Sequence, residues 1–132
     1  MENPTTPQYH LEWTHTIADI PKSQWNALAI TFKTPFLEWE WLHAMELSGS
    51  VNAEAGWQPN HLVIWAENSL VAAAPLYLKS HSYGEFVFDQ QWADLAYRLG
   101  IQYYPKLLGM SPFTPVEGYR FLIAPGLSLI HI

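Results

Sequence analysis

The residues best suited to chemistry lie in one polar segment, Lys79–Asp94, which reads KSHSYGEFVFDQQWAD. His81 and Glu85 are candidate catalytic general bases, because either group could serve as a base near neutral pH with modest burial. Asp89 follows Glu85 by four residues, so the two carboxylates would share one face of a helical turn and their pKa values would separate. The segment therefore has the groups that a proton-transfer site needs.

A second polar group follows in Tyr103, Tyr104 and Lys106. Each tyrosine offers a flat ring and one hydroxyl, which suits amide or sugar ligands, or a donor or leaving-group acid in catalysis. Arg120 could hold a carboxylate or a phosphate through two parallel hydrogen bonds. The residues predicted to bind substrate are Lys79, Ser82, Asp89, Tyr103, Tyr104, Lys106 and Arg120.

The same residues also have purely structural interpretations. His81 could donate to a loop carbonyl, Glu85 could pair with Lys79 or Lys106, and Asp89 could cap the helix that follows it. The tyrosines and the arginine could serve sheet packing and a surface ion pair. His43 with Glu40 or Glu46 has the spacing of a metal pair, but no third ligand is nominated, so a solvated helix face and no metal are expected.

The elements that must position these residues alternate between strands and helices. Strands are predicted over 9–17, 61–66, 70–78, 106–110 and 119–124, and helices over 22–30, 36–47 and 90–100. The run 70–78, LVAAAPLYL, is almost continuously apolar and predicts an interior strand buried on both faces. Pro75 cannot donate to a sheet ladder, so a bulge or a splayed edge is expected there. The order of elements predicts an α/β fold with a mixed sheet flanked by helices.

Two consequences of this arrangement can be checked in a structure. Trp41, Trp92 and Leu95 should be buried against the sheet, since they lie on the apolar stripes of the second and third helices. The polar segment follows a central strand, and the tyrosine group enters a neighbouring strand. Their side chains should therefore converge on one side of the sheet.

Composition narrows the class of protein. With 132 residues, 49% hydrophobic and 14% charged, the chain is predicted to form one globular domain. A net charge of −6 argues against a surface that binds nucleic acid through its phosphates. The absence of cysteine rules out disulfides and fits a cytoplasmic protein. The longest strongly apolar run is too short to span a membrane, and no signal peptide is visible at the N-terminus.

Two stretches carry a resemblance to a known family. HSYGEFVFD at 81–89, followed by WAD at 92–94, is one, and YYPKLLGMSPFTPVEGYR at 103–120 is the other. Together they resemble the FemAB-like peptidoglycan biosynthesis/recognition family, a branch of the GNAT-type acyltransferase superfamily, over about residues 25–125.

The resemblance implies a GNAT-like fold and transfer of an acyl or aminoacyl group to an amine, linked to peptidoglycan precursors. The implied partners are a small-molecule or peptide-like substrate, acyl-CoA as a cofactor, or tRNA as the acyl donor. The sequence departs from the acyltransferase pattern, because no glycine-rich phosphate-binding turn opens a helix and Arg98-Leu99-Gly100 closes one instead. The alternative function is a non-catalytic recognition half that binds a peptidoglycan-like or peptide ligand.

Both ends of the chain are predicted to differ from the domain between them. Residues 1–8 are expected to be disordered, and 9–126 to form the GNAT-like, FemAB-like domain. Residues 127–132, LSLIHI, match the translation of CTG TCT CTT ATA CAC ATC, the end of a transposase-based sequencing adaptor, so a non-native tail is expected. A native apolar terminus is the alternative. On the first reading the protein continues into a C-terminal half, and the fragment is expected to be inactive alone.

Overall fold

The computed structural model describes residues 8–81, 89–113 and 121–127, and the structural statements below refer to these residues. The α/β architecture is confirmed. The helices are α1 (Lys22–Ala29), α2 (Trp39–Leu47) and α3 (Gln90–Arg98). The strands are β1 (Tyr9–Thr14), β2 (Trp57–Pro59), β3 (His61–Ala66), β4 (Ser69–Ala74), β5 (Leu76–Lys79), β6 (Lys106–Gly109) and β7 (Leu122–Ile123).

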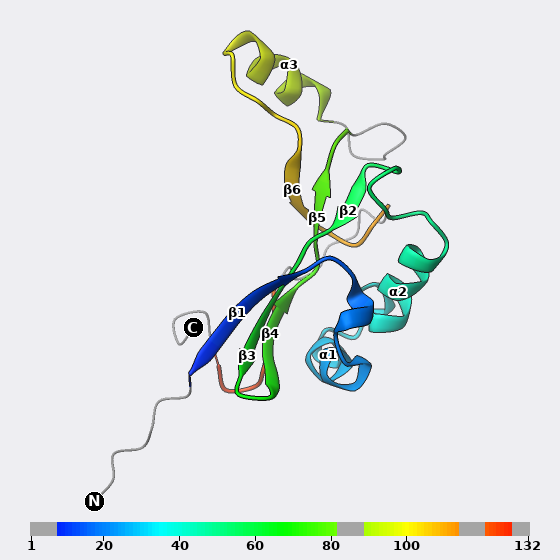
Figure 1. Ribbon diagram of the computed structural model, residues 1–132, viewed down its shortest axis with the longest axis vertical. Coiled ribbons are helices and arrows are strands. Elements are labelled where there is room, and N and C mark those ends of the chain that lie inside the picture. The colour runs from blue at the N-terminus through cyan, green and yellow to red at the C-terminus, as the bar shows by residue number, and fades with distance from the viewer. Residues whose placement is uncertain (1–7, 82–88, 114–120, 128–132) are drawn as a thin grey trace, which may run out of the picture.

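The strands form two antiparallel sheets, where the sequence predicted one mixed sheet. The first sheet has the order β1-β3-β4-β7, and the second has the order β2-β5-β6. A long two-stranded ribbon connects them, because β2 continues into β3 and β4 continues into β5 (Figure 1). β2 lies in a stretch for which the sequence predicted neither a strand nor a helix.

Pro75 marks the point where the ribbon passes from one sheet to the other. The run predicted as one strand is interior in both sheets and is divided at Pro75 into β4 and β5. Every residue from Leu70 to Pro75 is buried, which confirms the two-sided burial of this segment. Next to Pro75, the Asn60 amide donates to the Leu76 carbonyl (2.9 Å), so pairing resumes immediately after the break. Proline supplies no donor, and the sheet changes where that donor is missing.

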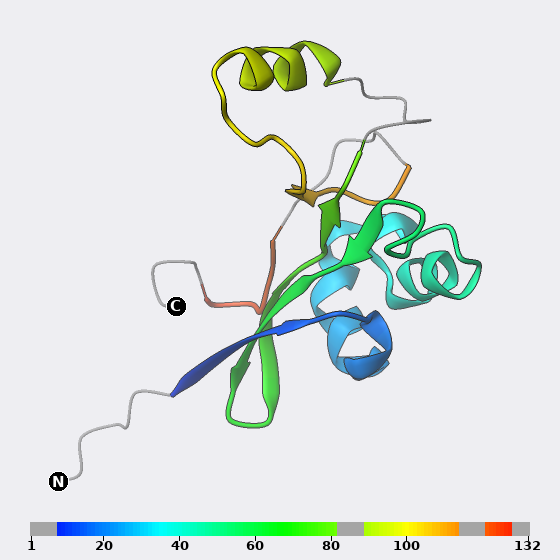
Figure 2. The same ribbon diagram turned by 45° about the horizontal axis from the view of Figure 1, so that its top comes forward.

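α1 and α2 lie on the same side of the two sheets (Figures 1 and 2). The main core lies between these helices and the first sheet and includes Trp25, Leu42, Val63 and Leu122, all fully buried. The Trp25 indole donates to the Leu37 carbonyl over 2.8 Å, so burial of its polar atom costs little. A second cluster joins the end of α2 to the second sheet through Met45 and Trp57.

The buried stripe of α2 differs from the one predicted. Leu42 is fully buried, while Trp41 is half-buried and donates from its indole nitrogen to the Ser111 hydroxyl (3.0 Å). The reason is a break at Glu38, whose extended backbone (φ −70°, ψ 146°) separates α2 from the 3₁₀ turn Pro35–Leu37. A helix that starts again at Trp39 has a different phase from one that runs unbroken from 36.

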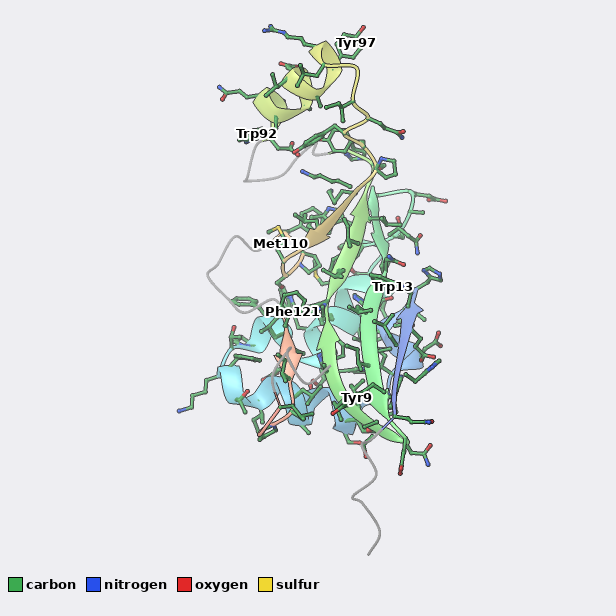
Figure 3. All side chains as sticks on the ribbon, turned by 90° about the vertical axis from the view of Figure 1, so that its left-hand side faces the viewer. Tyr9, Trp13, Trp92, Tyr97, Met110 and Phe121 are labelled. Atoms are coloured by element: carbon green, nitrogen blue, oxygen red, sulfur yellow. The ribbon has the colours of Figure 1, made fainter. Side chains whose placement is uncertain are left out.

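The predicted burial of α3 against the sheet is wrong. Trp92 is 67% exposed, Leu95 46% and Leu99 64%, whereas Ala96 is buried. α3 extends past the end of the second sheet, and Figure 3 shows Trp92 and Tyr97 at that end of the molecule. The apolar stripe of α3 exists, but no described element covers it.

Candidate functional site

The centre of the candidate site is the carboxylate of Asp89, which is buried. The Tyr104 hydroxyl donates to Oδ1 over 2.9 Å, and the Tyr103 hydroxyl donates to Oδ2 over 2.9 Å. The Lys106 ammonium donates to Oδ2 and forms a salt bridge with it. Two phenols and one cation therefore converge on one carboxylate, and four of the predicted site residues are brought together.

Local sequence places the three donors. Tyr103 and Tyr104 pack edge to face, with ring centroids 4.8 Å apart. The Lys106 ammonium lies 4.9 Å from the Tyr103 ring centroid and 5.6 Å from that of Tyr104. Lys106 is also the first residue of β6, so the sheet fixes its backbone. These contacts hold the ammonium beside both rings, where cation–π attraction adds to the ion pair.

The electrostatics of Lys106 follow from this placement. Burial acts to lower the pKa of Lys106, but its hydrogen bonds to Asp89 and Tyr103 outweigh burial, and the pKa is raised. Lys106 is therefore held as a cation.

Asp89 stands at the N-cap position of α3, as the structural interpretation predicted, but its side chain makes no capping hydrogen bond. The capping role is therefore wrong for this residue. A cap offers the carboxylate neutral amide donors, whereas Lys106 adds a full positive charge and the two tyrosines add two further donors. The carboxylate turns toward the stronger donors.

Lys79 lies on β5, directly opposite Lys106 in the register of the second sheet. Its side chain is fully buried, and its ammonium lies 4.1 Å from the ring centroid of Trp57. Trp57 belongs to β2, the neighbour of β5 on the side away from β6, and it pairs with Lys79 in the register of the sheet. The amino group of Lys79 therefore faces the Trp57 indole.

His81 follows β5 by two residues and is half-buried. Its imidazole lies against Gly56, where a Cβ would come within 2.6 Å of Nε2. Gly56 has φ +84°, and its carbonyl accepts from the Ser80 amide over 3.2 Å. The glycine therefore allows both the left-handed backbone and the close approach of the ring. His81 is thereby positioned at the same end of the second sheet as the Asp89 cluster.

The remaining predicted site residues, Ser82, Glu85 and Arg120, lie outside the described residues. The two helix residues considered as a metal pair with His43 have other partners. Glu40 pairs with Lys22 at 3.0 Å, and Glu46 accepts from the Ile17 amide at 2.9 Å. His43 stacks on Trp39, with ring centroids 4.3 Å apart. Within the described parts of the chain, no group of three His, Cys, Asp or Glu side chains could hold a metal ion.

Sequence reasoning missed a buried polar pair at the junction of the two sheets. His61 and Tyr77 are fully buried and pack edge to face, with ring centroids 5.1 Å apart. The Leu76 amide donates to His61 Nδ1 over 3.1 Å, which leaves the proton of the neutral ring on Nε2. His61 Nε2 and the Tyr77 hydroxyl have no hydrogen-bond partner among the described residues. The signal for His61 was its place at the start of an apolar strand, HLVIWA.

The comparisons with known proteins agree with the resemblance seen in the sequence. Residues 16–131 match the FemAB-like family, which is described as peptidoglycan biosynthesis/recognition. The chain therefore belongs to the FemAB-like family. Comparison with curated proteins and with solved structures gave no match. In the described ranges, none of the helices combines the length and the apolar character that crossing a membrane requires.

Proposed function

We propose that this FemAB-like protein transfers an acyl or aminoacyl group from an ester or thioester to an amine of a peptidoglycan-type acceptor. The observation that carries the proposal is the gathering of charged and aromatic groups at one end of the second sheet, the same end at which the His81 ring packs on Gly56. Buried ionisable groups beside a positioned imidazole are typical of catalytic sites.

His81 is the proposed general base. The acceptor amine attacks the carbonyl carbon, a carbon–nitrogen bond forms, and the carbon–oxygen or carbon–sulfur bond to the leaving group breaks. His81 takes the proton that the amine loses and returns it to the departing alkoxide or thiolate, so the ring is unchanged at the end. Glu85 is an alternative base that lies outside the described residues.

Three described lysines near the sheets and helices, Lys22, Lys79 and Lys106, are not placed to bind the pyrophosphate of acyl-CoA. A pyrophosphate needs a helix N-terminus or a cluster of cations that faces solvent. Lys79 is buried beside Trp57, Lys106 is paired with Asp89, and Lys22 is paired with Glu40. The acyl donor in this proposal is therefore defined only as an ester or thioester.

The test is turnover by the full-length product of the native gene, measured as amide formation by mass spectrometry with an ester or thioester donor and an amine-bearing peptide. His81→Ala should lower turnover by about 10²-fold, which is the usual contribution of a general base. His10→Ala is the matched control, because His10 lies on β1 in the other sheet with an exposed side chain. Wild-type turnover in His81→Ala would refute the role of His81.

A second candidate function is recognition of a peptidoglycan-like or peptide ligand without catalysis. The hydrogen bonds that Tyr103, Tyr104 and Lys106 donate to Asp89 favour this function. Side chains that are engaged with one another are better suited to shape a binding surface than to transfer protons to a substrate. In that case His81→Ala should weaken binding of the peptide and leave the rate of any transfer step unchanged.

A further inference from the structure

We propose that Tyr103, Tyr104 and Lys106 form a subsite for the carboxylate of a peptide-like acceptor, and that Asp89 occupies this subsite as an internal competitor. The acceptor displaces Asp89 when it binds. The identity of the acceptor rests on the proposed function, whereas the geometry of the subsite does not.

The donors are arranged for a carboxylate. One oxygen of Asp89 accepts from Tyr104, and the other accepts from Tyr103 and from Lys106. Both oxygens are used, and within the described part of the chain the negative charge faces one ammonium. A carboxylate from another molecule would find the same three donors, because all three come from the short stretch 103–106 and are held by their own ring contacts.

The charge of the subsite favours a carboxylate over a phosphate. A phosphate dianion is best held by two cations or by a guanidinium fork. The nearest cation in the sheet register is Lys79, and its ammonium lies against the Trp57 ring. Among residues 8–81, 89–113 and 121–127, Lys106 is the cation that contacts the tyrosine pair.

Asp89 is placed so that it can leave. The Asp89 and Lys106 side chains are 11% and 23% exposed, so the ion pair borders solvent. Asp89 is the N-cap residue of α3, whose apolar residues Trp92 and Leu95 are exposed, so a shift of the first turn of α3 would uncover none of the core formed by the described residues. The first amides of α3 have no side-chain cap, and a displaced Asp89 carboxylate would be able to accept from them.

The experiment measures equilibrium binding to the full-length product of the native gene, without an acyl donor. The probes are an N-acetylated alanine dipeptide with a free carboxylate, the same peptide as its amide, and inorganic phosphate. Asp89→Ala should bind the free carboxylate at least about 10-fold more tightly than the wild type, because the internal competitor is gone. The amide and phosphate should show no such gain. Lys106→Met in the Asp89→Ala background should abolish it.

Asp94→Ala is the matched control, since Asp94 is an exposed carboxylate of α3 and its removal changes the net charge equally. It should bind like the wild type. Asp89→Asn keeps an oxygen acceptor for the tyrosines and should tighten binding in the same direction if Asp89→Ala does not fold. The wild type itself should prefer the carboxylate peptide over its amide, and Lys106→Met should remove that preference.

Several results would overturn the proposal. They are unchanged or weaker binding by a folded Asp89 variant, a gain that survives Lys106→Met, or no carboxylate preference in the wild type. Because no acyl transfer is measured, these results are separate from the His81 test of the proposed function. Loss of turnover in His81→Ala with no gain in Asp89→Ala would keep the transferase and reject the competitor.

Discussion

The buried imidazole of His61 predicts a specific dependence of stability on pH. Burial lowers the pKa of His61 from 6.5 to about 4, because the interior disfavours the charged ring. Its Nδ1 accepts from the Leu76 amide, and protonation would destroy this hydrogen bond at the sheet junction. The folded protein therefore holds the neutral ring.

The direction follows from where the proton binds. Between pH 6.5 and about pH 4 the unfolded chain protonates this histidine and the folded chain does not. The free energy of unfolding therefore has its full His61 contribution above pH 6.5 and loses it as the pH falls. The shift corresponds to about 3 kcal/mol in total, of which about 2 kcal/mol should be lost by about pH 5.

Other ionisable groups near the junction act differently. Burial raises the pKa of the Glu46 carboxyl, which favours the folded state as the pH falls and so opposes His61. Burial also raises the pKa of Tyr77, which keeps its phenol neutral throughout this range. The contribution of His61 must therefore be measured as a difference between the wild type and a variant.

The variant is His61→Asn, whose amide oxygen can still accept from the Leu76 amide but does not titrate. Urea unfolding at about pH 7.5 and about pH 5 should show the wild type losing about 2 kcal/mol more than His61→Asn between the two conditions. His10→Asn, on the exposed part of β1, is the control and should keep the wild-type dependence. The same pH dependence in His61→Asn and the wild type would show that the reasoning about burial is wrong.

Two further predictions use matched pairs. Gly56→Ala should destabilise the protein by more than Gly100→Ala. Both residues have positive φ, at a cost of about 1 kcal/mol for alanine. Only at Gly56 would the new Cβ also meet the His81 ring, whereas nothing lies within 4 Å at Gly100. Equal losses in thermal unfolding would contradict that contact. Trp25→Ala should cost about 3–5 kcal/mol and Trp92→Ala less than about 1 kcal/mol, because the first is fully buried and the second is 67% exposed. Comparable losses in denaturant unfolding would mean that α3 is covered.

The sequence predicted the interior ribbon well because the signal there is local. The run LVAAAPLYL at 70–78 has no polar face to expose, so the sequence predicted burial on both sides. Pro75 had to interrupt the ladder because it lacks an amide proton. What the sequence could not show was that the ribbon would change sheets at this point. That depends on the partner strand, where Asn60 and His61 resume pairing with Leu76.

The burial of α3 could not be predicted from its pattern. Periodicity shows that a helix has an apolar stripe, but it does not identify what packs on that stripe. Trp92 and Leu95 were predicted on this stripe, and both are exposed in the structure. Contact between a helix and a sheet depends on the connections at both ends of the helix.

The position of the Asp89 cluster was predictable, but its chemistry was not. The order of elements placed Asp89 and residues 103–106 at neighbouring strand ends, and the register of β5 with β6 does bring Lys79 opposite Lys106. The carboxylate of Asp89 could accept either from the first amides of α3 or from the donors at residues 103–106. The local sequence favours the amides, but the positive charge of Lys106 outweighs them.

The same balance explains how the cluster can serve a ligand. Because Asp89 belongs to the chain, its carboxylate is present at the cluster at a high effective concentration. In the proposal above, a free carboxylate therefore displaces Asp89 only when its ligand also gains contacts elsewhere, such as at the end of the sheet where His81 lies. A subsite filled in this way selects for the whole ligand over its carboxylate alone.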